Sequence, residues 1–277
     1  MSLFEEIIRI FDTTGEIPGL FETYHLILLA LTALSTVVIC LLGKKASSKQ
    51  VRGIVLSVAI VVIILEIYKQ ICYTYNVTAE GIVADYLWYA FPWQFCSTPM
   101  YVGLLAGLTK KGRVHDAACA YLATYAIFAG LCVMIYPGDV FTEIVGINFQ
   151  TMVCHGTMIP VGAFLFASGH VKLEHKTILK ALSIFVIALL VAIISNEVAY
   201  RTGLLETDNF NMFYISPYCA PSLPVYSLVQ QVVPYPISLI IYIAGFTLAA
   251  YVILLIAMGI KKLACKLSPK KKAYTAV

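Results

Sequence analysis

Charged residues are scarce in this sequence: only 12% of its 277 residues are Asp, Glu, Lys or Arg, whereas 60% are hydrophobic. Soluble domains usually carry charge at about 25% of positions. The mean hydropathy of +0.87 indicates more apolar surface than one soluble core buries, and lipid is the solvent that accommodates it. The composition excludes an ordinary cytosolic protein and predicts an all-α, polytopic membrane protein.

Other familiar patterns are also missing. The eight cysteines form no close pairs, which excludes a disulfide framework and the usual zinc-ligand spacings. The first twenty residues lack the basic start and small-residue cleavage site of a signal peptide, so we expect the first apolar helix to stay in the membrane. The net charge of +4 comes from lysines in short loops. We therefore expect no metal, no cofactor and no nucleic-acid partner, and membrane lipids as the surrounding partners.

Seven segments have the apolar length of about 20 residues that a helix needs to cross a bilayer. They cover about 24–42, 53–73, 90–108, 116–136, 149–168, 178–199 and 235–260. Short polar or Gly- and Pro-containing breaks separate them. No soluble domain or internal repeat is evident, so the sequence predicts a single seven-helix transmembrane domain over residues 1–277.

The charges in the connecting loops alternate along the chain. Sixteen of the nineteen basic residues fall in one set of loops: Lys44, Lys45, Lys49, Arg52, Lys110, Lys111, Arg113, Lys172, Lys176, Lys180, Lys261, Lys262, Lys266, Lys270, Lys271 and Lys272. The other set holds Arg9, Lys69 and Arg201 and most of the acids, including Glu80, Asp85, Asp139, Glu143, Glu206 and Asp208. The positive-inside rule then predicts an N-terminus outside and a C-terminus in the cytoplasm.

Polar side chains inside the predicted spans gather in the outer half of four helices. They are Glu66, Lys69 and Gln70; Gln94, Cys96, Ser97 and Thr98; Gln150, Thr151, Cys154 and His155; and Asn196, Glu197 and Arg201. Because polar groups in lipid are costly, each is expected to have a partner or a function. The inner halves are almost entirely Leu, Ile, Val and Ala. The asymmetry predicts one polar pocket that opens toward the outer face.

Several of these residues also have a purely structural interpretation. Lys69 is close enough to the helix end to extend its ammonium to the interface. Glu197 and Arg201 have the i, i+4 spacing of a helix-surface pair. Glu66 either pairs with Lys69 or faces the pocket. The loop of about 202–234 is rich in aromatic residues and proline, which suits a cap over the pocket.

Cys96 and His155 are the candidate catalytic residues, because both lie five to six residues from the outer ends of helices that run in the same direction. A thiol beside an imidazole can become a thiolate, which accepts an acyl group as a thioester. Gln94 is placed to polarise a carbonyl oxygen. The alternative is that Cys96 is a small core residue and His155 a satisfied hydrogen-bonding group.

Three segments resemble the YwaF-like seven-helix integral membrane proteins of bacteria, which are related to eukaryotic transmembrane protein 164. The segments are Phe91-Pro92-Trp93-Gln94-Phe95-Cys96-Ser97, then Cys154-His155-Gly156, and the loop motifs Asn211-Met212-Phe213-Tyr214, Ser222-Leu223-Pro224 and Pro234-Tyr235-Pro236. With the seven spans, the resemblance covers essentially the whole chain.

The resemblance implies a cysteine-dependent acyltransferase that moves fatty acyl chains between phospholipids, with Cys96 as nucleophile and His155 as base. Members of the family more often carry a histidine at the position of Gln94 and His-His-Gly at that of Cys154-His155-Gly156. These departures leave the activity of this chain an expectation.

The sequence thus favours an acyltransferase that spans the membrane several times. The expected location is the cytoplasmic membrane of a bacterium. Its substrate-binding candidates are Gln94, Glu66, Gln150, Asn196 and Asn211. One alternative is a transporter or solute-binding permease in which Glu66, Lys69, His155 and Glu197 bind a polar solute or relay protons. Another is a seven-helix sensor, which the topology alone permits.

Overall fold

The computed structural model describes residues 2–79, 81–204 and 210–267. Within these ranges the protein is mostly helical, with one small β-hairpin. Six charged residues used in the loop pattern lie outside the described residues: Glu80, Glu206, Asp208, Lys270, Lys271 and Lys272.

The helices and strands follow one another along the chain in a simple order. The α-helices are α1 (Leu3–Phe11), α2 (Thr23–Leu42), α3 (Ser48–Cys72), α4 (Thr98–Leu108), α5 (Arg113–Tyr121), α6 (Ile127–Ile135), α7 (Val145–Ala167), α8 (Thr177–Arg201), α9 (Tyr226–Val232) and α10 (Tyr235–Leu267). Short helical turns are η1 (Gly43–Lys45), η2 (Trp88–Ala90), η3 (Leu122–Ala126) and η5 (Met212–Tyr214). The antiparallel hairpin pairs β1 (Tyr75–Thr78) with β2 (Gly81–Ala84).

In the part of the chain that is described, six helices are long and apolar enough to cross a membrane. They are α2 with η1, α3, the continuous run α5–η3–α6, α7, α8 and α10. Six of the predicted ranges therefore fall on membrane-length helices.

The seventh predicted range, 90–108, differs from the structure, because only the 11-residue helix α4 forms there. Residues 91–97 are turns and irregular chain. Pro99 is in the first turn of α4, where its missing N–H costs nothing, and a proline there favours a helix start. Pro92 restricts the backbone of the residue before it and adds to the interruption. Apolar composition alone predicted a helix where proline prevents one.

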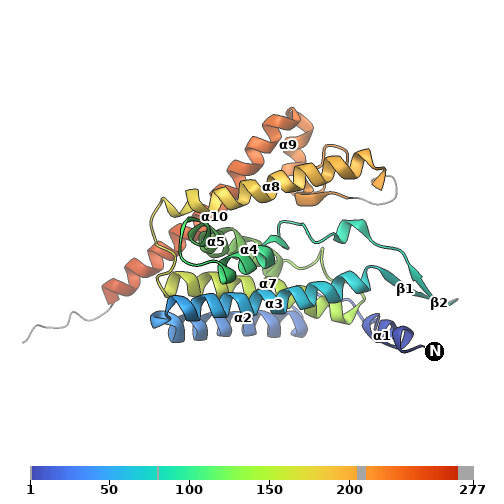
Figure 1. Ribbon diagram of the computed structural model, residues 1–277, viewed down its shortest axis with the longest axis horizontal. Coiled ribbons are helices and arrows are strands. Elements are labelled where there is room, and N and C mark those ends of the chain that lie inside the picture. The colour runs from blue at the N-terminus through green and yellow to red at the C-terminus, as the bar shows by residue number, and fades with distance from the viewer. Residues whose placement is uncertain (1, 80, 205–209, 268–277) are drawn as a thin grey trace, which may run out of the picture.

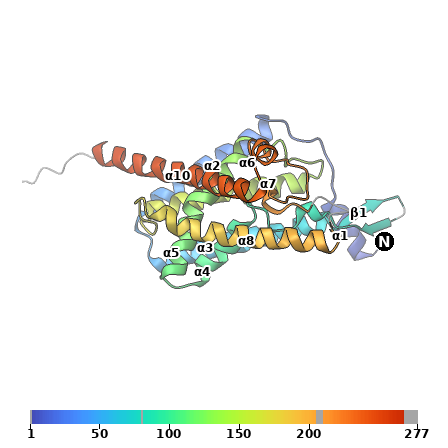
Figure 2. The same ribbon diagram turned by 90° about the horizontal axis from the view of Figure 1, so that it is seen from above.

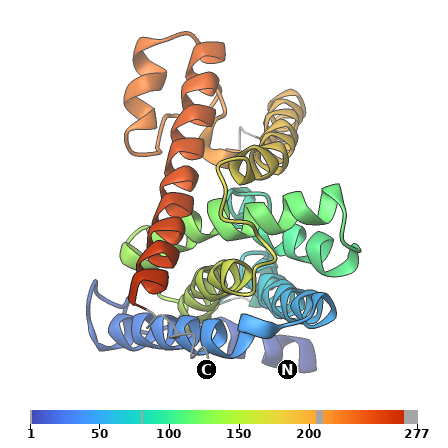
Figure 3. The same cartoon turned by 90° about the vertical axis from the view of Figure 1, so that its left-hand side faces the viewer.

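The elements give the molecule two distinct ends (Figure 1). The hairpin end carries α1 and the β1–β2 hairpin. The lysine end carries the α2–α3 connection, the α4–α5 turn, the α7–α8 loop and the last turns of α10. Figure 3 views the molecule from the lysine end and shows how the long helices are arranged around one another.

Helix α7 is at the centre of the packing. It contacts α2 and α3 on one side and α6 with η3 on the other, while α8 packs against α5 and α10 against η3. Helix α10 crosses the others obliquely and carries α9 at its hairpin-end side (Figure 2). Gly162 permits the close approach of α7 to η3: a Cβ there would lie 2.6 Å from the Leu122 carbonyl oxygen.

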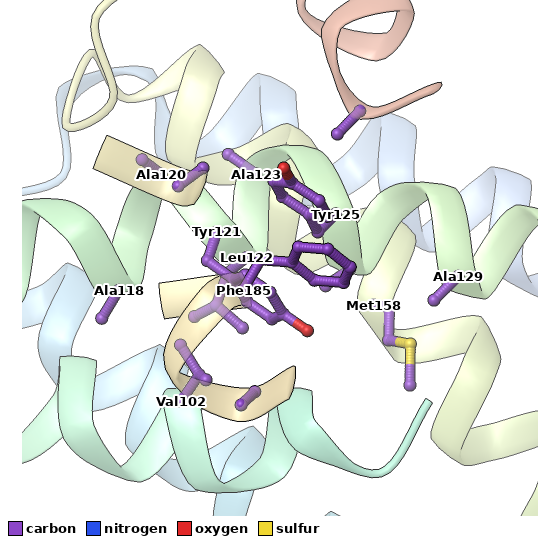
Figure 4. Close-up of a cluster of buried hydrophobic side chains, with 14 of the residues drawn as sticks. Val102, Ala118, Ala120, Tyr121, Leu122, Ala123, Tyr125, Ala129, Met158 and Phe185 are labelled. Atoms are coloured by element: carbon purple, nitrogen blue, oxygen red, sulfur yellow. The ribbon is translucent and has the colours of Figure 1, made fainter. Parts of the chain in front are cut away.

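The core is built around stacked aromatic rings (Figure 4). The rings of Tyr121 and Tyr125 are 5.4 Å apart and nearly parallel, and that of Tyr125 is 4.6 Å from Phe185 on α8. Tyr125 lies in η3, which is a π-helical turn. Such a turn places an extra residue in the α5–α6 run, and π-helical turns are often found near functional sites. The Tyr121 hydroxyl is hydrogen-bonded to that of Thr98 at 2.5 Å, so the aromatic stack is tied to the start of α4.

Candidate functional site

A buried ion pair lies on the part of α3 nearest the hairpin end. Lys69 Nζ is 2.8 Å from Glu66 Oε1, and only 7% of Glu66 is exposed. Gln70 donates to Glu66 Oε1 at 2.7 Å and to the Ala90 carbonyl at 2.9 Å. The pairing of Glu66 with Lys69, one of two sequence-based interpretations, is confirmed. A buried pair of this kind depends on both partners, because removing one leaves an uncompensated charge.

Cys96 lies in the turn that precedes α4, two residues before the helix begins. The turn is closed by the Ser97 N–H, which donates to the Gln94 carbonyl at 2.8 Å. The thiol is half-buried. The N-terminal end of a helix favours negative charge, so Cys96 occupies a better place for a transient thiolate than the mid-helix position predicted from the sequence.

Helix α7 presents the predicted polar residues as a connected group. Gln150 Nε2 donates to Cys154 Sγ at 3.4 Å, and the Thr151 hydroxyl donates to Gln150 Oε1 at 3.4 Å. Gln150 is 3% exposed and His155 is 7% exposed. The side chain of Gln150, a substrate-binding candidate, is therefore hydrogen-bonded to Thr151 and Cys154 of its own helix.

His155 has one satisfied and one unsatisfied ring nitrogen. Nδ1 lies 2.7 Å from the Thr151 carbonyl oxygen, which only accepts, so Nδ1 carries the proton in the neutral ring. Nε2 then has a free lone pair. It is buried, and no residue in the described part of the chain hydrogen-bonds to it. Buried polar groups without partners are uncommon and suggest a functional role.

The Lys69 ammonium connects the three helices electrostatically. It lies close enough to Cys96, Cys154 and His155 to act on all three groups. Cys96 and Cys154 are also within electrostatic range of each other. The fold thus gathers the polar residues of α3, α7 and the turn before α4 into one region.

The start of α4 and the middle of α7 lie beside each other. Pro99 and Met100 of α4 line the same small cavity as Cys154 of α7. No hydrogen bond between Cys96 and His155 is formed among the described residues. The two candidate catalytic groups therefore belong to neighbouring elements and are not directly bonded.

Gln94 and Asn211 hold the loop that follows α8. Gln94 Nε2 donates to the Asn211 carbonyl at 3.0 Å, and Gln94 Oε1 accepts from the Phe213 N–H at 2.9 Å. The Asn211 side chain accepts from the Ser216 N–H at 2.9 Å. The side chains of both substrate-binding candidates are therefore hydrogen-bonded to backbone groups, and these bonds fix the conformation of the loop.

Asn196 makes a second bidentate contact to the same loop. Its Nδ2 donates to the Met212 carbonyl at 3.0 Å, and its Oδ1 accepts from the Met212 N–H at 2.8 Å. We call Gln94, Asn196 and the backbone of residues 211–213 the amide clamp. Phe213 and Tyr214 both have left-handed backbone conformations, with φ of 58° and 56°. Residues other than glycine adopt this conformation only when the surrounding structure imposes it.

The amide clamp places Tyr214 beside the candidate nucleophile. Burial raises the pKa of Tyr214 to about 12, and the nearby Cys96 and Asp139 add to the increase. The sequence-based interpretation did not identify Tyr214 as a site residue. Tyr214 belongs to the loop motif Asn211-Met212-Phe213-Tyr214 that carries the family resemblance, and this motif was the signal that could have pointed to it; two consecutive left-handed residues are not visible in composition or periodicity.

A second thiol–imidazole pair was also missed. His115 and Cys119 lie at i, i+4 on α5, with His115 Nε2 3.5 Å from Cys119 Sγ and His115 Nδ1 2.9 Å from the Ala106 carbonyl oxygen. Both residues are buried, at 4% and 1% exposure. Every nitrogen of His115 has a partner, so this pair has the properties of a satisfied core contact.

Glu197 and Arg201 lie outside this region. Arg201 is 2.6 Å from Glu197 Oε1, which confirms the predicted i, i+4 pair. Tyr218 donates to the other carboxylate oxygen at 2.6 Å. The Arg201 side chain is 74% exposed, so these groups form a surface contact.

Comparison with known sequences gives one family. The sequence profile of the TMEM164 family matches residues 20–258, a range that contains Cys96, His155 and the amide clamp. No curated protein sequence and no solved structure shows significant similarity to the chain. The match extends over most of the sequence and agrees with the resemblance found in its motifs: the chain is an integral membrane protein that belongs to the TMEM164 family.

Proposed function

We propose that the protein is a cysteine-dependent acyltransferase that moves fatty acyl chains between membrane phospholipids at Cys96. The observation that carries the proposal is the lone pair of His155 Nε2, which is buried, fixed in orientation by the Thr151 carbonyl and without a hydrogen-bond donor among the described residues. A general base needs such an available nitrogen within reach of the proton it removes. Rotation of the half-buried Cys96 side chain toward α7 supplies that proton.

The first half-reaction transfers the acyl group to sulfur. The Cys96 S–H gives its proton to His155 Nε2, and the sulfur bonds to the carbonyl carbon of a fatty acyl ester. The ester C–O bond breaks, and the leaving oxygen takes the proton from Nε2 to become the hydroxyl of a lysophospholipid. Cys96 is left as a thioester.

The second half-reaction reverses these steps on another lipid. The hydroxyl of an acceptor lysophospholipid gives its proton to Nε2 while its oxygen attacks the thioester carbonyl. The C–S bond breaks, and Cys96 recovers the proton. The same nitrogen serves as base and then as acid in each half-reaction.

The surroundings of Cys96 support this chemistry. The N-terminal end of α4 favours negative charge on the Cys96 sulfur. In the transition state, the Lys69 ammonium also stabilises the carbonyl oxygen as it becomes negative. Glu66 keeps Lys69 in place through their 2.8 Å contact. Gln94 and Asn211 contribute by holding the loop rather than by contacting the acyl group.

A small apolar cavity borders the polar region at Cys154. It has a volume of about 30 Å³ and lies between α3, α4, η3 and α7, with Ala59, Pro99, Met100 and Cys154 among its lining residues. A space of this size holds about one water-sized group, so it marks incomplete packing beside the polar region and is too small for an acyl chain.

The proposal includes the membrane arrangement. The irregular segment 91–97 and α4 together make a seventh crossing, with the hairpin end outside and the lysine end in the cytoplasm of a bacterial cell. Support comes from the sixteen-to-three distribution of basic residues between alternate loops.

The test is an acyl-exchange assay on the purified full chain. Phospholipid with a labelled acyl chain is supplied with an unlabelled lysophospholipid, and labelled product is measured by chromatography. We expect transfer with the natural protein and with Cys119→Ala, and none above background with Cys96→Ala. Equal transfer by the natural protein and Cys96→Ala would exclude Cys96 as the nucleophile.

A further inference from the structure

A large groove lies between α2 and α3 at the lysine end. Helices α2 and α3 each pack against α7 but make few contacts with each other. The space between them has a volume of about 1030 Å³, at the upper end of the range of about 300–1,000 Å³ for ligand sites. Its walls are Ser35, Val38, Ile39 and Leu42 of α2 and Gly53, Ile54, Ser57 and Val58 of α3, and its floor is Thr157, Pro160, Val161 and Phe164 of α7.

Small residues keep this α2–α3 groove open. A Cβ built on Gly53 would meet no atom within 4 Å. The groove runs along about eight residues of each helix, about 12 Å of the roughly 15 Å depth of one leaflet. Its dimensions suit an extended acyl chain lying along the helices.

The interior of the groove is chemically apolar. The Ser35 hydroxyl donates to the Thr32 carbonyl at 3.0 Å, and the Thr157 hydroxyl donates to the Cys154 carbonyl at 3.0 Å. These hydroxyls are satisfied by their own helices, so the remaining surface is mostly methyl and methylene groups. A hydrocarbon chain fits such a surface better than a polar solute does.

The mouth of the groove is positively charged. Lys45 and Gln50 line it, and Lys44 and Lys49 are their neighbours in sequence. The sequence contains no acidic residue between Glu22 and Glu66. In the described part of the chain, none of these three lysines forms an ion pair. Helix α3 begins at the same mouth, and its positive end adds to the attraction for an anion.

We propose that the α2–α3 groove binds one acidic glycerophospholipid from the leaflet at the lysine end. Its acyl chain lies over Gly53 and Ser57, and its phosphate contacts Lys44, Lys45 and Lys49. The inference does not depend on acyl transfer at Cys96, because it concerns another leaflet and other residues. Charge complementarity selects the headgroup, since each nearby lysine attracts anionic lipid appreciably.

The experiment measures lipid binding to the delipidated full chain by native mass spectrometry. Phosphatidylglycerol and phosphatidylcholine with identical acyl chains are added at equal concentration. We expect a one-to-one complex with phosphatidylglycerol, preferred by about tenfold or more over phosphatidylcholine. Equal binding of the two lipids overturns the proposal, because it shows nonselective contact with surrounding lipid only.

Two sets of variants locate the site. Gly53→Leu adds a side chain to the groove at a position where a Cβ meets no atom within 4 Å, and it is expected to reduce binding of both lipids by about tenfold. Gly245→Leu, where a Cβ on α10 also meets no atom within 4 Å, is expected to leave binding unchanged. Equal losses from the two substitutions contradict the assignment to the groove. Thermal unfolding of the lipid-free variants, expected to match the natural protein, separates loss of the site from loss of the fold.

The second set tests the headgroup. Lys44→Gln, Lys45→Gln and Lys49→Gln combined are expected to reduce phosphatidylglycerol binding to the phosphatidylcholine level. The control replaces Lys261, Lys262 and Lys266, at the same end of the molecule on α10, with glutamine and is expected to retain the preference. If the control loses the preference to the same extent, the general charge of this end, and not the groove, selects the lipid.

Discussion

The buried histidines His25 and His155 differ from each other in how their ring nitrogens are used, and His115 resembles His25 in having a partner on both nitrogens. His25 accepts from the Phe21 N–H at 3.0 Å and donates to the Met134 carbonyl at 2.8 Å. His155 has one partner, and its Nε2 is buried without another in the described part of the chain. A fully bonded imidazole contributes to stability, whereas an imidazole with a free lone pair is available for chemistry.

This difference gives a prediction at the residue scale. His155→Ala is expected to reduce acyl transfer by about 100-fold or more, with a small change in unfolding temperature. His25→Ala is expected to destabilise the protein by about 2–4 kcal/mol, because it leaves a cavity and removes the partner of the buried Met134 carbonyl and of the Phe21 N–H. Unfolding by intrinsic fluorescence and the exchange assay measure the two effects. The opposite pattern would make His155 a structural residue.

The amide clamp is a second residue-scale feature with a measurable effect. Gln94→Ala leaves the Asn211 carbonyl and the Phe213 N–H without partners and is expected to cost about 1–3 kcal/mol of stability. Gln94→Glu keeps the acceptor for the Phe213 N–H and should cost less. Gln230→Ala is the control, because Gln230 Oε1 accepts no hydrogen bond within the described residues. If Gln94→Ala and Gln230→Ala have the same unfolding temperature, the hydrogen bonds of the amide clamp do not stabilise the protein.

At the scale of elements, the approach of α6 to α7 depends on glycine. A Cβ at Gly162 would lie 2.6 Å from the Leu122 carbonyl oxygen, and one at Gly130 would lie 2.7 Å from the His155 carbonyl oxygen. Backbone atoms cannot move aside as flexible side chains can, so any larger residue separates the helices.

We therefore expect Gly162→Ala to destabilise the protein by about 1–3 kcal/mol through overpacking. Gly245→Ala on α10 makes the same chemical change in open space and is expected to leave stability unchanged or slightly higher. The unfolding midpoints of the two variants in the same detergent give the comparison. Equal midpoints would mean that α6 and α7 adjust without strain.

The elements also show what the sequence could and could not predict. Hydropathy located α2, α3, α7, α8 and α10, because each is a long apolar run whose prolines, where present, lie in the first turn (Pro236 of α10) or in the second half of the helix (Pro160 of α7). It failed at residues 90–97, where apolar side chains belong to a turn that Pro92 and Pro99 impose. The β1–β2 hairpin was not predicted, because its strands have only four residues each.

The sequence predicted which residues belong to the candidate site, but it did not predict which groups they are hydrogen-bonded to. The depth of polar residues identified Glu66, Cys96 and His155. The same reasoning treated Gln94 and Asn196 as substrate ligands, whereas the structure engages both with the backbone of residues 211–213. Such contacts join segments more than 100 residues apart for Gln94, and no local pattern records them.

At the scale of the whole molecule, the distribution of charge between the two ends predicts the orientation in the membrane. The lysine end carries the basic loops, and the hairpin end carries Glu6 and Asp85 in exposed positions. Lys/Arg-rich loops remain in the cytoplasm during insertion. We therefore expect the hairpin end to be accessible from outside the cell.

Labelling with a membrane-impermeant maleimide tests this orientation. Ala79→Cys, at the hairpin end, should react in intact cells, whereas Lys111→Cys, at the lysine end, should react only after the membrane is opened. Both positions are exposed, and the parent protein with its eight natural cysteines gives the background. Reaction of Lys111→Cys alone in intact cells would reverse the orientation.

The central claim is that Cys96 carries the acyl group. The most direct measurement is the mass of the Cys96 peptide after the purified protein has been incubated with phospholipid of known acyl composition. We expect a hydroxylamine-sensitive mass increase of one acyl group on that peptide and none on the peptide of Cys119. An unmodified Cys96 peptide under conditions in which acyl exchange proceeds, or an adduct that persists in Cys96→Ala, would contradict the account.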